Sequence, residues 1–554
     1  MDNDEQEFPA GGRWTRRRFL EAMAATGGAA ALYARAEAET PPPMEPAPHV
    51  GRGRTALVLG AGVGGMAAAL HLLDMGFQVT VLEAQGRTGG RSLTLRNGDQ
   101  VVEVRNGARE TQQFRMDRGL YFNAGPGRIP YHHTHLIRWC RDLGVELEPY
   151  VMMTRANLFQ TPRAFGQAPV PNRRLANDTR GWLAELVAKG AGCPELADDL
   201  RGVDPAGLQA LLRVFGDLTP AGEYTGSTRS GYVVPPGVTT PGEKEPPLPL
   251  AELVQSQFWA HKFYQPEEWD WQPTLFQPRG GMDRIERAMA ARLGTRIRLG
   301  REVVRVETVD GPTPRVRVVH RNAATQAGQQ ELTADLCIST IPLPILARTP
   351  NNFSPDFRAA IAAVPFAPTC KVGWQSDGRF WEDDDQIYGG ISYIDHPITQ
   401  MWYPSSGFFE RTGVLTGTYN YEGDALDFGR MAPHERLEKA AEGALRLHPQ
   451  FNRHVPRAKG ISIAWQNVPF QEGGWAEWTE EMTEPYTRLL HPEGSFWVAG
   501  DQVSYLPGWQ EGAVLSAQYV VQNLVRPPRL LGEARPVRRA PNTARVVRGE
   551  RTGP

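Results

Sequence analysis

A glycine-rich turn gives the clearest chemical signal in the sequence. Gly60, Gly62 and Gly65 form the pattern GxGxxG directly after the apolar run 55–59, and Glu83 lies 18 residues after Gly65. Glycines at this spacing allow a tight turn and close approach of a pyrophosphate, while the following helix offers free N–H groups and a partial positive charge. A carboxylate in the place of Glu83 can accept hydrogen bonds from ribose hydroxyls. The motif therefore predicts a dinucleotide site, without separating NAD from FAD.

Two further segments favour a flavin. The Gly-Gly-Arg segment 89–91 follows Glu83 closely, and Asp501 ends the apolar run 496–500 shortly before the segment 508–513. Together with the glycine-rich turn, these segments resemble the flavin amine oxidase superfamily. The resemblance implies that Asp501 holds the ribityl chain and that a helix N-terminus faces the pyrimidine end of the flavin. Reduced flavin gathers negative charge there, which a helix N-terminus stabilises.

The resemblance also implies a set of contacts to FAD. These are Gly60, Gly62, Gly64, Gly65, Glu83, Ala84, Gly90, Arg91, Gly127, Arg128, Val303, Gly500, Asp501, Trp509, Gln510 and Ala513. Val303 lies in the run 301–306, which resembles the strand whose valine contacts adenine through its backbone. Trp475 stands where monoamine oxidases carry the cysteine that bonds the flavin covalently. We therefore expect non-covalent FAD.

Arg128 is the candidate for binding a substrate carboxylate. An arginine suits this task because its planar guanidinium can pair with both carboxylate oxygens. The surrounding segment 125–130, Gly-Pro-Gly-Arg-Ile-Pro, resembles the motif of L-amino acid oxidases in which the arginine binds the substrate carboxylate. In the run 414–425, which resembles the strand of the family's carboxylate-binding tyrosine, Tyr419 is the expected partner. Tyr421, two residues on and on the same strand face, is the rival assignment.

Lys371 is the candidate catalytic residue. It lies among apolar residues at the position of the family lysine that holds a water near the flavin N5 atom and is implicated in oxygen activation. Only six of the 60 basic residues are lysines, so a lysine among apolar residues at this position indicates a specific role rather than an ordinary surface charge. Residues expected to line the reacting face of the flavin and the substrate are Trp465, Trp475, Gly508 and Trp509.

The histidines at 132, 133 and 135 invite a metal interpretation. No acidic residue or cysteine lies near them at the spacing of metal ligands, and the family places a helix start here, so we expect no metal site.

The elements that must position these residues indicate an α/β plus α+β fold. We expect a Rossmann-like FAD domain, interleaved with a mixed-sheet substrate-binding domain and a helical insertion. A first strand at 55–59, a helix at 66–75 and a second strand at 77–82 form its first βαβ unit. The predicted segments are 54–130, 272–348 and 458–526 for the FAD domain, 131–271 for the helical funnel and 349–457 for the substrate domain. Within the funnel, the stretch 219–249 has seven prolines and five glycines, which indicates a lid or a protease-sensitive loop.

Composition supports a globular protein with a small-molecule partner. The 554 residues carry 62 acidic and 60 basic side chains, a net charge of -2, and are 41% hydrophobic. This balance argues against disorder of the whole chain and against a nucleic-acid surface built on bulk charge. Four cysteines without a CxxC pair indicate neither a zinc site nor a disulfide framework, and we expect them to be buried small side chains.

The first 38 residues predict an export signal. Arg16-Arg17 followed by Phe19-Leu20 resembles the twin-arginine motif, and the alanine-rich run 22–34 is too short to span a bilayer. We expect cleavage after an A-x-A site at 34–36 or 36–38, recognition of the precursor by the twin-arginine export machinery, and a periplasmic or secreted product. A linker at 39–53 and a disordered basic tail at 527–554 complete the expected organisation.

The resemblance implies FAD-dependent oxidation of an L-amino acid by O2 to an α-keto acid, ammonia and hydrogen peroxide. A homodimer is the candidate assembly, and the sequence leaves the oligomeric state open. Four alternatives stay open: a decarboxylating 2-monooxygenase that yields an amide, a primary amine or polyamine oxidase, a dehydrogenase that passes electrons to a quinone, and a flavin-bound protein without catalysis. The side-chain preference of the substrate stays undetermined.

Overall fold

A five-stranded parallel sheet forms the centre of the first domain. The computed structural model describes residues 49–191, 193, 196 and 198–525. The order of the strands is β14 (Ile297–Arg298), β2 (Gln78–Leu82), β1 (Thr55–Leu59), β18 (Leu336–Ser339) and β24 (Phe496–Val498). Strand β1 coincides with the predicted apolar run, and it is buried from Ala56 to Leu59, as expected for a parallel strand covered on both faces. All the neighbouring strands pair in parallel.

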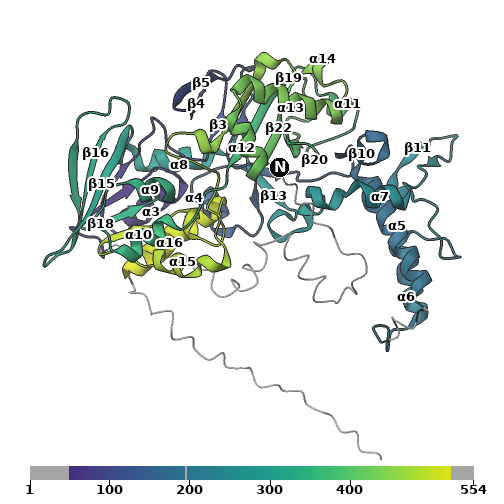
Figure 1. Ribbon diagram of the computed structural model, residues 1–554, viewed down its shortest axis with the longest axis horizontal. Coiled ribbons are helices and arrows are strands. Elements are labelled where there is room, and N and C mark those ends of the chain that lie inside the picture. The colour runs from purple at the N-terminus through teal and green to yellow at the C-terminus, as the bar shows by residue number, and fades with distance from the viewer. Residues whose placement is uncertain (1–48, 192, 194–195, 197, 526–554) are drawn as a thin grey trace, which may run out of the picture.

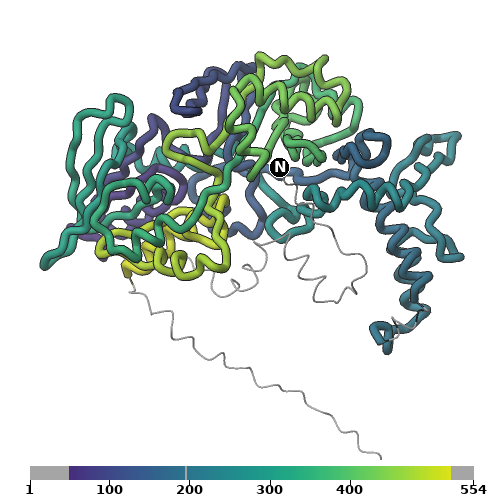
Figure 2. Tube along the Cα trace, in the orientation of Figure 1, coloured from purple at the N-terminus to yellow at the C-terminus, as the bar shows by residue number. Residues whose placement is uncertain are grey.

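Segments far apart in the sequence cover one face of this sheet. The helices are α3 (Val63–Asp74), α8 (Asp283–Leu293) and α16 (Gln510–Val525). Helix α3 begins three residues before the predicted start, within the glycine motif, and packs closely on α16. Figure 2 shows the purple N-terminal and yellow C-terminal parts of the chain side by side in this lobe. The sheet draws its strands from all three segments predicted for the FAD domain.

The other face of the sheet packs against a second group of elements. It includes the antiparallel sheet β15 (Arg301–Val309), β16 (Arg315–Asn322) and β17 (Gln330–Ala334), and the helices α9 (Leu343–Arg348), α10 (Pro355–Ala362) and α15 (Thr483–Leu489). Leu57 and Leu59 of β1 share a buried core with Phe353 and Phe357 of this group.

A seven-stranded mixed sheet forms the second domain (Figure 1). Its order is β10 (Val170–Pro171), β9 (Leu158–Gln160), β20 (Ile391–Ile394), β21 (Gln400–Trp402), β22 (Gly413–Tyr421), β19 (Thr369–Ser376) and β23 (Gly460–Ala464). Helices α11 (Phe380–Asp383), α12 (Glu422–Arg430), α13 (Pro433–Leu447) and α14 (Phe451–His454) complete the domain. Only four of the seven strands lie in the predicted substrate segment, because β9, β10 and β23 are contributed by the segments on either side of it.

The segment 131–271 is less purely helical than its composition predicts. Its helices are α4 (Thr134–Asp142), α5 (Asn172–Gly190), α6 (Pro205–Gly216) and α7 (Leu250–Ser256), and α5 and α6 project from the body of the molecule (Figure 1). It also supplies β8 (Leu147–Tyr150), which pairs with β13 (Leu275–Pro278), itself paired with β7 (Ile129–Pro130). Small hairpins and bridges elsewhere are β3 (Thr94–Leu95) with β6 (Phe122–Asn123), and β4 (Gln100–Arg105) with β5 (Ala108–Gln113).

The proline-rich stretch 219–249 contains the hairpin β11 (Tyr232–Val234) and β12 (Glu243–Lys244), and a buried carboxylate anchors it. Asp178 of α5 is fully buried and accepts hydrogen bonds from the Tyr224 hydroxyl (2.6 Å), the Ser230 hydroxyl (2.5 Å) and the Leu248 amide (2.9 Å). These bonds tie the first part of the stretch and its C-terminal end to α5, on either side of the hairpin.

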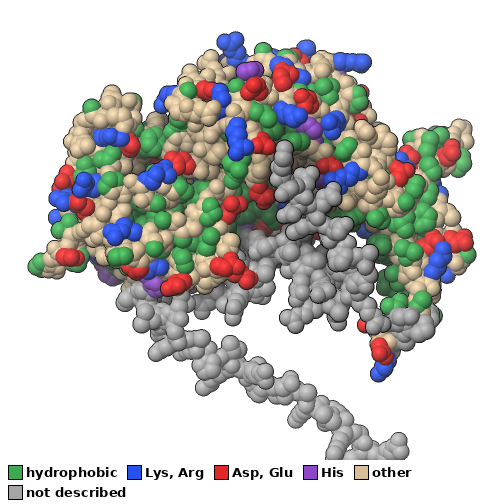
Figure 3. Space-filling model, in the orientation of Figure 1, with side chains coloured by type: hydrophobic (Ala, Val, Ile, Leu, Met, Phe, Trp, Pro, Cys, Tyr) green, Lys and Arg blue, Asp and Glu red, His purple; other side chains and the backbone are tan. Residues whose placement is uncertain are grey.

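Several predictions concern parts of the chain outside the described residues. The export signal at 1–38, most of the linker and the basic tail at 527–554 lie there. Among the described residues, none of the helices has the length and apolar character needed to cross a membrane. All four cysteines are free thiols, and Cys140, Cys337 and Cys370 are buried as expected. The expectation is wrong for Cys193, which is exposed because it lies in the connection between α5 and α6 rather than in the core. On the face drawn in Figure 3, acidic and basic side chains are interspersed.

Candidate active site

A large cavity lies at the carboxyl ends of the parallel strands, where ligands bind in open α/β sheets. Its volume is about 910 Å³. Most of the predicted cofactor residues line it: Gly60, Gly62, Gly64, Glu83, Ala84, Gly90, Arg91, Val303, Gly500, Asp501, Trp509 and Gln510, together with Gly508. Strands β1, β2, β15 and β24 and the start of α16 position these residues, so the tertiary structure unites contacts predicted from five distant segments.

The glycines of the first turn have two different tasks. A Cβ on Gly62 would meet no atom within 4 Å, and Gly62 faces the cavity, so this glycine keeps space free for a ligand. A Cβ on Gly65 would lie 2.0 Å from the carbonyl oxygen of Gly60, so this glycine allows α3 to pack against the turn. Gly60 itself has a φ of 103°, which favours glycine. The empty volume at Gly62 and the helix N-terminus behind it fit the pyrophosphate of a dinucleotide.

Polar groups along the cavity fit the remaining parts of a flavin dinucleotide. Glu83 is 6% exposed, and its carboxylate accepts the amides of Ala61 and Gln85, each at 2.8 Å. The Asp501 carboxylate forms an ion pair with Arg91 and accepts the Gly508 amide at 2.9 Å. Carboxylates therefore lie at the ends of β2 and β24, where the sequence predicts contacts to the ribose and the ribityl chain.

Four predicted cofactor contacts lie outside the cavity wall. Gly65 allows α3 to pack against the first turn, and Ala513 of α16 packs beside Gly64 of α3. A Cβ on Gly127 would lie 2.7 Å from Cζ3 of Trp402, so the absence of a side chain here makes room for that indole. Arg128 follows it and lies against the same ring rather than in the cavity wall.

Lys371 and Tyr419 come together because β19 and β22 pair in the register that sets these two residues opposite each other. Lys371 is 3% exposed, and its Nζ donates to the carbonyl oxygens of Gly125 at 2.5 Å and Asn123 at 3.3 Å. The ammonium also lies 4.8 Å from the centre of the Tyr419 ring. Burial, and after it the charge of Arg128, lowers the pKa of Lys371 to about 7.

The Arg128 side chain is half-buried, and its guanidinium lacks an anionic partner among the described residues. Its Nε and Nη1 atoms have no hydrogen-bond partner, and its Cζ lies 5.0 Å from the centre of the Trp402 ring and 5.9 Å from that of Tyr150. In the part of the chain that the structure describes, no carboxylate forms an ion pair with Arg128 or Lys371. Two cations beside aromatic rings and without a protein carboxylate are suited to an anionic ligand.

The aromatic residues divide between this site and the core. Trp402, which the sequence did not indicate, connects the site: its ring contacts the Tyr419 ring at 5.2 Å and lies 4.5 Å from the Lys371 Nζ. Tyr421 lies farther out, with its ring 6.4 Å from that of Trp475. Both predicted tyrosines are therefore near the site, and Tyr419 shares the Trp402 ring with Arg128.

Of the three predicted tryptophans, Trp509 lines the cavity and Trp475 packs beside Gly508. Trp465 is 4% exposed and belongs to the core. Its indole N–H donates to the Ala124 carbonyl at 3.0 Å, so it supports the segment that carries the Lys371 acceptors instead of facing the cavity.

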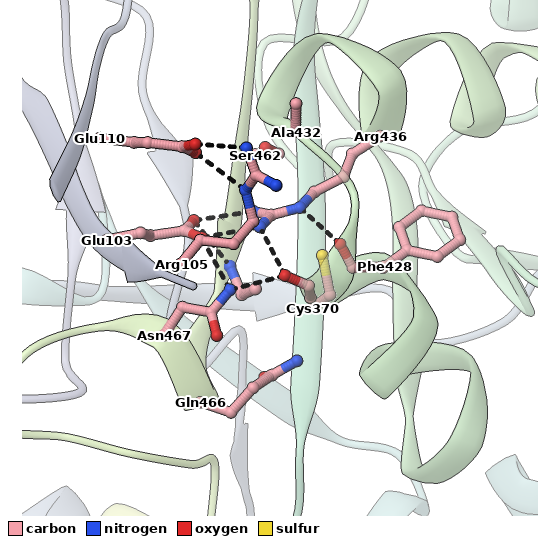
Figure 4. A network of polar contacts seen from close by, with 12 residues as sticks. Glu103, Arg105, Glu110, Cys370, Phe428, Ala432, Arg436, Ser462, Gln466 and Asn467 are labelled. Carbon is pink, nitrogen blue, oxygen red and sulfur yellow. Dashed lines mark hydrogen bonds and ion pairs between the residues drawn. The ribbon is translucent and has the colours of Figure 1, made fainter. Parts of the chain in front are cut away.

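A buried ion pair supports this segment from behind (Figure 4). Arg436 and Glu103 are at most 1% exposed and form two hydrogen bonds of 2.8 Å. Glu103 also accepts the Ala464 amide at 3.0 Å, next to Trp465. The pair therefore ties the β4–β5 hairpin and α13 to the turn that holds Trp465. No local pattern in the sequence could identify it, because its partners are 333 residues apart.

The histidine cluster has a partner that the sequence did not indicate. Asp270 lies 138 residues after His132, and its Oδ1 is 3.1 Å from the Nε2 of that histidine. The prediction of no metal site was based on the absence of a nearby acidic residue, and the tertiary structure supplies one.

The chain belongs to the family of flavin containing amine oxidoreductases, whose model matches residues 63–224 and 244–525. Its cofactor is therefore a flavin. Among curated proteins, the chain is 26% identical over 488 residues to a putative L-amino-acid oxidase, YobN, of Bacillus subtilis (strain 168), covering 85% of this chain and 95% of the relative. It is 28% identical over 499 residues to the flavin-dependent L-tryptophan oxidase RebO of Lentzea aerocolonigenes, covering 84% and 96%.

Solved structures of two amine oxidases share the fold. Wild-type putrescine oxidase bound to putrescine has a TM-score of 0.53 at 17% identity, covering 85% of this chain and 99% of that one. Cyclohexylamine oxidase from Brevibacterium oxydans also has a TM-score of 0.53 at 17% identity, covering 85% and 98%. Membership of the family makes the protein a flavin-dependent oxidoreductase of the class that acts on CH–NH2 groups.

Proposed function

We propose that the protein is an FAD-dependent L-amino acid oxidase. The observation that carries this proposal is the half-buried Arg128 side chain, whose buried Nε and Nη1 atoms lack any hydrogen-bond partner in the described chain. An amine substrate without a carboxylate would leave this charge uncompensated, whereas an α-carboxylate would satisfy it with paired hydrogen bonds. The relatives named as oxidases of L-amino acids support the same substrate class.

In this proposal, Arg128 and Tyr419 hold the carboxylate and so orient the substrate Cα–H. Bound FAD, held by the residues of the cavity and without a covalent bond, would accept a hydride from Cα and return the electrons to O2, giving hydrogen peroxide. Water then converts the imino acid into an α-keto acid and ammonia. The Trp402 and Trp509 rings exclude water from the site.

Lys371 is proposed to act in the oxygen half of the reaction. Its Nζ is anchored by two backbone carbonyls, so it is fixed within the site rather than free to reach the surface. It can position a water molecule with its third N–H when it is protonated, or with its lone pair when it is neutral. The substrate has to react as a neutral amine, and we propose that its ammonium proton leaves before or during binding. We further propose export through the twin-arginine pathway, which the N-terminal motif supports.

An anaerobic screen tests the substrate class. Each of the 20 L-amino acids and a set of simple amines is mixed with the flavin-loaded protein, loss of the flavin absorbance is followed, and peroxide is measured after air is admitted. We expect bleaching and peroxide with at least one amino acid. Bleaching by amines alone would refute the proposal, an amide product would identify a monooxygenase, and bleaching without oxygen consumption would identify a dehydrogenase.

Substitution of Arg128 gives a sharper test. We expect Arg128→Met to lower kcat/KM for the best amino acid by about a hundredfold or more, because charge-assisted hydrogen bonds contribute about 1.5–3 kcal/mol each. The corresponding decarboxylated amine should lose no activity. The control is Arg430→Met, which removes an exposed arginine paired with Asp427. Equal losses for the amino acid and the amine would contradict the role of Arg128.

A further inference from the structure

Three candidate ligands meet where the helical segment 131–271 leaves and rejoins the rest of the chain. His132 and His133 directly precede α4, and Asp270 lies in the 3-10 turn η6 (Trp269–Trp271). One ligand atom from each residue can be chosen so that all three lie within 4.8 Å of one another. None of these residues has a part in the proposed oxidation.

His133 is a buried polar side chain without a partner. It is 1% exposed, and neither Nδ1 nor Nε2 has a hydrogen-bond partner in the described structure. Its ring is fixed edge-on between the rings of His132, at 4.9 Å, and Trp509, at 5.0 Å. Buried polar atoms are almost always paired, and an imidazole nitrogen is a good metal ligand. A cation at this point would supply the missing partner.

Asp270 is a buried carboxylate without a permanent positive charge beside it. It is 5% exposed, and within the described ranges its one ion pair is with His132. His132 also has an unpartnered buried nitrogen, Nδ1. A buried carboxylate is costly unless it is neutralised, and a divalent cation is an efficient way to neutralise it.

We propose that His132, His133 and Asp270 bind a divalent transition-metal ion of the Zn²⁺ type. Two imidazoles and one carboxylate are a ligand set typical of such ions, with water at the fourth position. Bonds of about 2.0–2.2 Å limit ligand atoms to about 4 Å apart, so the side chains have to close by about 1 Å on binding. The Trp269 indole, stacked on His132 at 4.8 Å, is 57% exposed, and the His132 side chain is 18% exposed, so these two rings give an ion a path from the surface to the buried ligands.

A bound ion would join the start of α4 to η6 and so fasten both ends of the helical segment to each other. The ring of His133 also contacts Trp509, which lines the flavin cavity. The proposal does not depend on the substrate of the enzyme, and metal binding can be measured without any turnover.

Metal uptake by the flavin-loaded protein tests the proposal. The protein is treated with a chelator, dialysed, and titrated with Zn²⁺ by calorimetry, with elemental analysis of the product. We expect one Zn²⁺ per chain and an affinity at least tenfold lower in His133→Phe, which keeps a ring against Trp509, and in Asp270→Asn. The control is His320→Phe, because His320 is also 1% exposed with two unpartnered ring nitrogens but lies outside the cluster.

The proposal fails if the folded wild-type protein takes up no Zn²⁺, if both cluster variants bind it as the wild type does, or if the His320 variant loses binding equally. Should the cluster variants fold poorly, Co²⁺ added to the wild-type protein provides a second measurement. Tetrahedral nitrogen and oxygen ligands would produce absorption bands at wavelengths beyond those of the flavin, and the absence of these bands would overturn the site.

Discussion

Replacing Lys371 by methionine should make the protein more stable near neutral pH, and the gain should disappear as the pH rises. Burial lowers the pKa of this lysine from 10.5 to about 7. In the unfolded chain the lysine binds its proton up to about pH 10, so between pH 7 and pH 10 the unfolded state holds more protons than the folded state. The stability of the wild type therefore rises with pH over this range, whereas Lys371→Met lacks this contribution.

The expected size follows from the shift. Lowering the pKa from 10.5 to about 7 corresponds to roughly 5 kcal/mol, with a slope of at most about 1.4 kcal/mol per pH unit. Methionine also leaves the carbonyls of Gly125 and Asn123 without their donor, which subtracts about 1–3 kcal/mol. This loss does not depend on pH, because a neutral amine still donates hydrogen bonds. The difference in unfolding free energy between the two proteins at one pH therefore combines both effects. Only the pH dependence of that difference measures the cost of the buried charge.

Denaturant unfolding with excess FAD, followed from pH 6 to pH 10, measures the difference. The control is Lys439→Met, which removes a half-exposed lysine paired with Glu442 and should show a flat difference. A Lys371→Met difference that changes by less than about 1 kcal/mol between pH 7 and pH 10 would refute the assignment of a strongly depressed pKa. If the stability gain of Lys371→Met grew with pH, the pKa of Lys371 would be raised in the folded protein and not lowered.

Three other predictions test the scaffold. Gly62→Ala should weaken flavin binding but leave the unfolding temperature of the flavin-free protein unchanged, whereas Gly65→Ala should lower that temperature because its Cβ would meet a carbonyl oxygen at 2.0 Å. Flavin titration and thermal scans distinguish the two variants. If both variants behaved alike, the assignment of Gly62 to ligand space and of Gly65 to helix packing would be contradicted. Arg436→Met should destabilise the protein by about 3–5 kcal/mol by leaving Glu103 buried and unpaired, and adding Glu103→Gln should recover much of this loss in thermal unfolding; no recovery would argue against an isolated pair effect. Asp178→Asn should speed proteolytic cleavage of the proline-rich loop that it anchors, as followed by limited digestion, and an unchanged cleavage rate would show that other contacts hold this loop.

The sequence alone predicted the elements whose signals are local. The run 55–59, the glycine motif and Glu83 lie within about 30 residues of one another, and one βαβ unit fixes their relative positions. For this reason the first strand, the turn and the carboxylate at the end of β2 lie where the pattern places them. The resemblance identified Arg128 and Lys371 as site candidates in the same way, because a short motif surrounds each residue.

Contacts between distant segments could not be read from such patterns. Trp402 lies in a strand without a recognisable motif, yet its ring contacts Lys371, Tyr419 and Arg128. The predicted role of Trp465 at the flavin depended on its motif, but in the structure its side chain packs into the core and bonds to Ala124.

The sequence by itself therefore predicted the family and most of the residues that line the large cavity, because glycine spacing, apolar periodicity and short motifs act over a few residues. Only the tertiary structure decided which charges lie unpaired, because burial and the presence of a counter-ion depend on segments that meet after folding. Arg128 without a carboxylate and Asp270 beside His132 are both of this kind. Whether a buried charged group has a partner of opposite charge decides its chemistry. The residues next to it in the sequence do not indicate whether such a partner is present.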